Sequence, residues 1–152
     1  MNTDLEIKTY IGVGNVRFGM KPEEVAKVFG TPDKTTKNFL KEKIEYRNKS
    51  GLVATYSLTD GSLIELGFRP IILSLRFKGI RIFEDPYDEV FKKLLHEDSN
   101  PYQSLGIVVL LNLGIALTGF LQEDEDDRSV TIFSKGRWDF LKEELEPFRS
   151  KV

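Results

Sequence analysis

Two features of this sequence have side chains suited to chemistry: a single histidine and a run of five carboxylates. His96 is a candidate general base, because imidazole readily exchanges a proton near neutral pH. The residues that follow it, 97–101, are typical of the end of a helix, where the helix dipole stabilises a cation. No Gly-x-Ser-x-Gly motif provides a nucleophile for a Ser-His-Asp arrangement. We therefore predict no catalytic residue and a protein that is not an enzyme.

The five carboxylates are consecutive and form the strongest charge feature of the chain: Glu123, Asp124, Glu125, Asp126 and Asp127. Adjacent carboxylates repel one another and do not pack in a core, so they predict an exposed loop between strands. Such a loop is a solvated turn, a contact surface for a basic partner or a calcium site. The ligand spacing and the glycine of an EF-hand loop are missing, so we predict no metal site. Our hypothesis is that these five residues bind a partner.

Cofactor binding is not predicted. The chain contains no cysteine, which excludes disulfides, thiolate metal ligands and cysteine nucleophiles and favours the reducing cytoplasm. Gly12-Val13-Gly14 lacks the Gly-x-Gly-x-x-Gly spacing and precedes a strand, so it predicts a tight hairpin instead of a nucleotide cradle. The N-terminus lacks the basic and apolar regions of a signal peptide. The apolar stretch 105–121 suits buried strands better than a membrane helix.

Length and charge narrow the class of protein further. A chain of 152 residues fits one globular domain, 1–152, that can bury its own core. The net charge is −2, and residues 77–152 hold 15 acidic but only 10 basic side chains. Nucleic-acid binders present a clustered basic face, so the acidic second half argues against a nucleic-acid partner and for a basic protein partner.

The elements that must position these residues follow from turn and helix signals. Pro22 and Pro86 each predict the first position of a helix, with Asp85 as an N-cap. Trp138 and the apolar residues after it predict a C-terminal amphipathic helix over 136–147. The expected strands span 52–58, 63–69, 71–77, 105–110, 114–121 and 129–133, and the polar stretch 34–49 is a loop or a poor helix. Strands in runs with interspersed helices predict an α+β fold with a mainly antiparallel sheet and helices packed on it.

Two segments resemble each other and suggest an internal repeat. A two-residue turn, a short strand, a proline and a helix follow in that order in residues 14–29 and again in residues 78–95. Chance similarity over so short a stretch is one explanation. The other is a duplication over 11–70 and 75–134, which predicts two related hairpin–helix–strand units in a pseudo-twofold arrangement.

The opening of the chain also resembles a known group of proteins. Residues 11–20 read Ile-Gly-Val-Gly-Asn-Val-Arg-Phe-Gly-Met and are followed by Glu24-Val25 and Phe29-Gly30-Thr31-Pro32. This pattern is similar to small bacterial immunity proteins encoded beside polymorphic or contact-dependent toxins. The match continues through short motifs at 77–80, 104–107 and 129–133. The first helix also resembles that of BamE/SmpA-type modules, whose lipid-anchoring cysteine is missing here.

The resemblance implies a cytoplasmic, non-catalytic protein that binds and neutralises a cognate toxin by covering its surface. Because such toxins are often basic nucleases, the acidic second half would take the place of their phosphate ligands. The alternative from a different class is a small-ligand-binding or enzymatic domain with an apolar pocket between helices and sheet. A third possibility is a purely structural or assembly partner.

Overall fold

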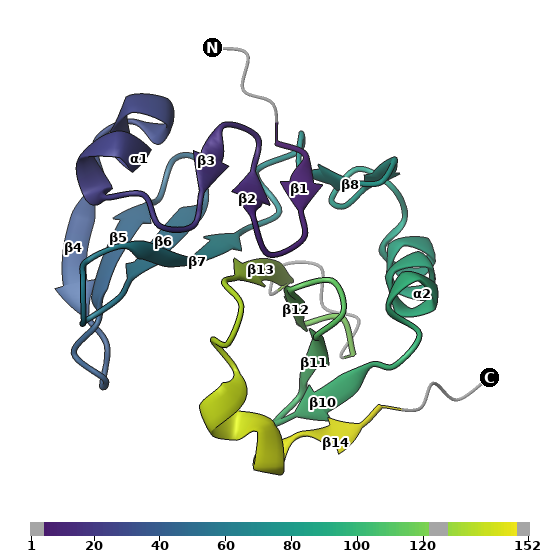
Figure 1. Ribbon diagram of the computed structural model, residues 1–152. Coiled ribbons are helices and arrows are strands. Elements are labelled where there is room, and N and C mark those ends of the chain that lie inside the picture. Colours follow the sequence, from purple (N-terminus) through teal and green to yellow (C-terminus); the bar gives the residue numbers. More distant parts are fainter. Residues whose placement is uncertain (1–4, 122–127, 149–152) are drawn as a thin grey trace.

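The computed structural model describes residues 5–121 and 128–148, which form an α+β fold built on one large antiparallel sheet (Figure 1). The strand order of this sheet is β14-β10-β11-β12-β13-β7-β6-β5-β4. Its strands are β4 (Lys34–Lys37), β5 (Lys43–Arg47), β6 (Leu52–Tyr56), β7 (Leu63–Phe68), β10 (Tyr102–Ser104), β11 (Ile107–Leu110), β12 (Ile115–Thr118), β13 (Ser129–Phe133) and β14 (Glu146–Pro147). The other elements are β1 (Ile7–Lys8), β2 (Gly12–Val13), β3 (Val16–Arg17), β8 (Arg76–Phe77), β9 (Ile80–Arg81), α1 (Pro22–Phe29), α2 (Tyr87–Asp98) and a 3₁₀ helix (Asp139–Glu144).

The same order of elements occurs twice along the chain. The hairpin β2–β3, helix α1 and strands β4 to β7 are followed by the hairpin β8–β9, helix α2 and strands β10 to β13. The two hairpins share one register, since Val13 lies opposite Val16 and Phe77 lies opposite Ile80. Strands β7 and β13 pair antiparallel at the centre of the sheet, which relates the halves by an approximate twofold axis. This is the pseudo-twofold arrangement expected from the sequence.

One face of the sheet carries the main hydrophobic core. Both helices and the β1–β3 sheet lie on this side (Figure 1). Val25 of α1 and Val90 and Leu94 of α2 are fully buried against apolar side chains of the sheet such as Leu66 and Ile132. Burying one such side chain contributes roughly 1.5–3 kcal/mol to folding, so the two helices are held chiefly by this contact.

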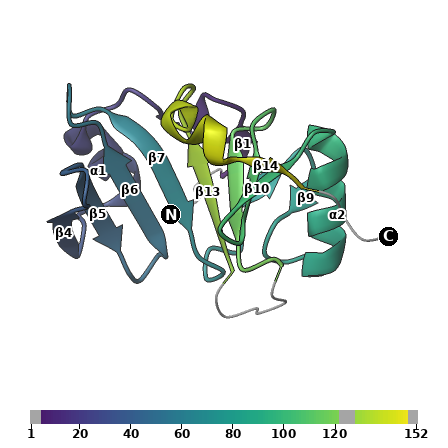
Figure 2. The ribbon, with the colours of Figure 1, turned by 90° about the horizontal axis from the view of Figure 1, so that it is seen from below.

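Within residues 5–121 and 128–148, secondary-structure elements cover the opposite face over the second half of the sheet only. The C-terminal segment leaves β13, passes through the 3₁₀ helix and returns beside β10 as β14 (Figure 2). Trp138 and Leu145 of this segment pack against Val109, Ala116 and Phe133. Over β5, β6 and β7, no described element covers the corresponding face.

Three expectations about the elements are wrong. The stretch 34–49 forms two strands instead of a loop or helix. Lys34 and Lys37 are exposed on the edge strand β4, where charge discourages pairing with another chain. Only the last two residues of the strand expected over 71–77 are extended. Pro86 is the N-cap of α2 instead of its first helical residue, which is Tyr87. The Asp85 carboxylate does not cap the helix but accepts hydrogen bonds from the backbone and side chain of Arg81.

The C-terminal segment also differs from the single helix expected over 136–147. It forms a 3₁₀ helix over Asp139–Glu144 and an edge strand over Glu146–Pro147. Trp138 and Leu145 pack on one side of the sheet, whereas Phe148 packs against the main core. One continuous helix does not present both sets of contacts, and Pro147 does not support helical hydrogen bonding at its position.

Candidate functional site

The turn between β4 and β5 is tightly held by one asparagine. The Asn38 side-chain oxygen accepts hydrogen bonds from the backbone N–H groups of Leu40 (2.9 Å) and Glu42 (3.0 Å). The Asn38 amide group donates to the Glu42 carboxylate at 2.8 Å, and the two backbones also bond at 3.1 Å. Lys41 adopts the left-handed backbone conformation with φ of 66°. Because both ends of the turn are tied together in this way, its tip has few alternative conformations.

This rigid turn presents an aromatic side chain to solvent. Phe39 is 91% exposed and Leu40 is 39% exposed. The neighbouring Lys37 and Lys41 are also exposed, so cationic groups flank the ring. A single exposed apolar residue is common on a protein surface, but a Phe with almost no internal contact on a well-ordered turn contributes little to folding.

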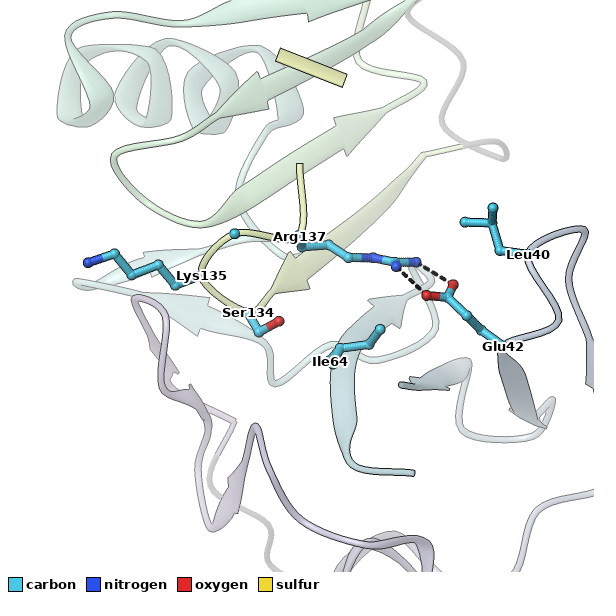
Figure 3. A pocket seen from close by; sticks show the side chains of 7 residues that line it. Leu40, Glu42, Ile64, Ser134, Lys135 and Arg137 are labelled. Carbon is cyan, nitrogen blue, oxygen red and sulfur yellow. Dashed lines mark hydrogen bonds and ion pairs between the residues drawn. The ribbon is translucent and has the colours of Figure 1, made fainter. Parts of the chain in front are cut away.

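A charge cluster joins this turn to the rest of the sheet (Figure 3). Arg137, from the segment after β13, donates hydrogen bonds to both oxygens of the Glu42 carboxylate at 2.6 and 2.9 Å. Its Nε donates a longer hydrogen bond, 3.2 Å, to Glu65 of β7. The three side chains are 15%, 11% and 27% exposed, respectively. One guanidinium therefore serves two poorly solvated carboxylates, and Glu42 holds it in the bidentate geometry.

The two carboxylates respond differently to this environment. The hydrogen bonds from Arg137 lower the pKa of Glu42 below its usual value, against the opposing effect of burial. Burial raises the pKa of Glu65, and the Arg137 charge only partly offsets this effect. Glu65 is thus the member of the cluster whose negative charge is less well compensated.

Two neighbouring hollows lie along the uncovered face of the sheet. The first has a volume of about 410 Å³ and is lined by Leu40, Glu42, Ile64 and residues 134–137. The second, of about 400 Å³, is lined by Val53, Glu65, Gly67, Phe68, Arg69, Arg128, Ser129 and Thr131. Arg137 lines the first hollow and bonds to Glu65 in the second, so the charge cluster forms the boundary between them. The turn and the two hollows together form a continuous candidate binding face.

A second polar cluster lies in the core and is structural in character. The Glu45 carboxylate accepts a hydrogen bond from the Tyr56 hydroxyl at 2.8 Å and contacts Arg47 at 3.5 Å. Arg47 also donates to the Gly30 carbonyl at the C-terminal end of α1, where a cation is favoured. Burial is the main cause that raises the pKa of Tyr56, and the hydrogen bond to Glu45 raises it further. These three residues are at most 4% exposed, so the cluster fastens α1 to the sheet and is almost shielded from solvent.

The residues singled out in the sequence do not gather at this face. His96 is exposed on α2, beside a hollow that Lys78, Lys92 and Lys93 also line. The run Glu123, Asp124, Glu125, Asp126 and Asp127 lies outside the described residues, so its role as a partner-binding surface stays a prediction. Within residues 5–121 and 128–148, no three His, Asp or Glu side chains come together as metal ligands. Among the same residues, no helix is both long and apolar enough to cross a membrane.

Gly12 has the structural role expected for a tight hairpin. Its φ is 152°, and a Cβ atom at this position would lie 2.0 Å from the Val16 carbonyl oxygen. The close approach of β2 to β3 therefore requires a glycine, and no nucleotide is needed to explain it.

Sequence reasoning missed the residues that make up the candidate face. Asn38 and Glu42 are four positions apart around an apolar pair, which is a recognisable turn signal in a stretch that was expected to be a loop or a poor helix. No local signal connects Arg137 with Glu42, because 95 positions separate them and only the sheet brings them together.

Comparisons with protein-family models, with curated proteins and with solved structures gave no match to this chain.

Proposed function

We propose that this protein is a non-catalytic binding protein that covers a surface of a partner protein with the candidate binding face. The observation that carries the proposal is Phe39, whose ring is 91% exposed on a turn that several hydrogen bonds hold in place. An aromatic residue that makes few internal contacts but is rigidly presented has the properties of an interface anchor. The adjoining uncovered strands supply area around it.

The energetics of association favour such an anchor. Burying a Phe side chain contributes roughly 1.5–3 kcal/mol, which is about 10- to 150-fold in affinity. Because the turn is already ordered in the unbound protein, little conformational entropy remains to be lost on binding. The exposed Lys37 and Lys41 beside the ring favour a partner surface that is apolar at its centre and acidic at its margin.

The charged groups of the face support binding more than reaction chemistry. The Arg137 guanidinium is engaged by two carboxylates, and the lowered pKa of Glu42 keeps that group ionised. A general base is more effective when its pKa lies near neutral pH, which argues against Glu42. Glu65 has a raised pKa, but its carboxylate already accepts a hydrogen bond from Arg137. An electrophilic arginine needs N–H groups directed at a substrate. The geometry instead fixes the orientation of the turn relative to β7.

Among binding proteins, we propose the immunity type, which acts in the cytoplasm and neutralises a cognate toxin encoded beside it. The support for this step is the resemblance of residues 11–32 to the opening of such proteins and the acidic charge of the second half. In this proposal, the carboxylates at 123–127 provide an additional contact for a basic region of the toxin.

Co-expression with the product of the adjacent gene tests the proposal. We expect the adjacent product to be toxic alone, to be neutralised by this protein, and to bind it in isothermal titration calorimetry. Phe39→Ser should weaken binding by at least 10-fold. Leu105→Ser is the matched control, because Leu105 is 98% exposed on the turn between β10 and β11, the equivalent position in the second half of the fold.

Two results would contradict the proposed function. One is an adjacent product that is harmless or forms no complex, which refutes the immunity role. The other is tight binding that Phe39→Ser leaves unchanged, which refutes the proposed surface.

A further inference from the structure

Gly67, the last but one residue of β7, lines the second hollow, and the fold itself does not require a glycine there. A Cβ atom at this position would meet Val53 at 3.6 Å and Thr131 at 3.7 Å, which are ordinary contact distances. Glycine in a strand interior weakens the sheet, and it often marks a place where another molecule approaches the backbone. Val53 and Thr131 lie directly opposite Gly67 on the two neighbouring strands, so the bare backbone forms the floor of the hollow.

The two ends of this hollow differ in charge. Glu65 lies two positions before Gly67 on the same face of β7, and among the described residues its side chain accepts one hydrogen bond, from Arg137 at 3.2 Å. At the other end, the exposed Arg69 and the buried Arg128 both line the hollow beside Ser129. The end with Glu65 thus offers an incompletely paired carboxylate at low solvent exposure, where a second cation would be strongly favoured.

We propose that the hollow floored by Gly67 receives a cationic side chain of the partner, an arginine or a lysine, whose charged head pairs with Glu65. The aliphatic stem of this side chain lies across Gly67 between Val53 and Thr131. The positive charges of Arg69 and Arg128 set the direction of entry, because they repel a cation at that end. This inference rests on the proposed binding function and adds the chemistry of the partner: one basic side chain beside the apolar contact made by Phe39.

A small probe tests the hollow without the partner. In ¹⁵N-labelled protein, we expect N-acetyl-arginine amide to cause saturable shifts of the backbone amide signals of Gly67 and Thr131. The uncharged N-acetyl-citrulline amide has nearly the same shape and should cause no saturable shift. Glu65→Gln should weaken the arginine effect at least 10-fold, and Gly67→Val, which fills the floor with a residue suited to strands, should abolish it.

Two control variants isolate the site. Glu89→Gln removes an exposed carboxylate from α2 and should leave the response unchanged. Phe39→Ser should also leave it unchanged, so that failure of the hollow and failure of the proposed binding function are told apart. The dispersion of the amide spectrum shows whether each variant is folded.

Three outcomes would overturn the inference. They are no saturable shift in the wild-type protein, equal shifts from the citrulline probe, and an undiminished response in a folded Glu65→Gln variant. If Gly67→Val is folded and binds the probe as well as the wild type, the location over Gly67 is wrong.

Discussion

Replacing Arg137 with Met tests whether this residue joins the β4–β5 turn to β7 in the candidate binding face. The substitution keeps an unbranched apolar stem but leaves the Glu42 and Glu65 carboxylates without their shared cation. Removing one partner from a fully buried ion pair typically costs about 3–5 kcal/mol. Because the three side chains here are between 11% and 27% exposed, we expect a smaller loss, about 2–3 kcal/mol at pH 7.

The pH dependence identifies the cause of the loss. In the wild type, the pKa of Glu42 is lowered, so its contribution is present above the unfolded-state pKa and is lost as the pH falls through the folded-state pKa. In Arg137→Met, burial and mutual repulsion raise the pKa values of both carboxylates. Protonation in the folded state then relieves their destabilising effect as the pH falls. The stability difference between the two proteins should therefore shrink from pH 7 to pH 4.

Urea denaturation at the two pH values measures this difference, and thermal denaturation at pH 7 should show a decrease in Tm of about 5–10 °C for a domain of this size. Arg137→Lys is the matched control, since it keeps the charge but not the bidentate geometry, and it should fall between the wild type and Arg137→Met. A loss below about 0.5 kcal/mol at pH 7, or an equal loss at pH 4, would refute the role given to Arg137.

Three further substitutions have outcomes set by local geometry. Gly12→Ala should lower the free energy of unfolding in urea by more than about 2 kcal/mol, because its Cβ would overlap the Val16 carbonyl oxygen. Gly67→Ala should be neutral or slightly stabilising, because its Cβ would meet only ordinary contacts. Equal effects of the two substitutions would contradict this contrast. Asn38→Ala should cost about 1–2 kcal/mol and speed amide hydrogen exchange in the β4–β5 turn, and unchanged exchange would show that the turn is not held by this side chain. Asp98→Ala should cost about 2–3 kcal/mol, because the carboxylate of this 1% exposed residue accepts hydrogen bonds from the backbone N–H groups of Asn100 and Asn112. A urea midpoint equal to that of the wild type would refute that role.

The features that local sequence signals predicted are those that depend on neighbours in the chain. Pro22 begins α1, where its fixed φ suits the first helical position. The strands expected over 52–58 and 63–69 are present as β6 and β7, with a turn between them. The repeated hairpin and helix were visible because the two copies use similar residues in the same order. Strands β7 and β13 join the two halves of the chain into one sheet, in the expected pseudo-twofold arrangement.

The features that were missed depend on distant contacts. The charged stretch 34–49 has little intrinsic preference for strands, but β5 pairs along its whole length with β6, and β4 then extends the sheet. The C-terminal helix was expected from apolar spacing, yet Trp138 and Phe148 belong to opposite sides of the sheet. The binding face could not be predicted for the same reason, because Glu42, Glu65 and Arg137 come from three separate parts of the chain.

The binding role of the uncovered face is tested most directly by hydrogen exchange on the complex with the adjacent gene product. We predict that binding slows amide exchange in the β4–β5 turn at 38–42 and along β7 at 65–67, while the outer surface of α2 around His96 is unaffected. A tight complex in which exchange slows only around α2 or other elements outside this face would contradict the proposed mode of binding.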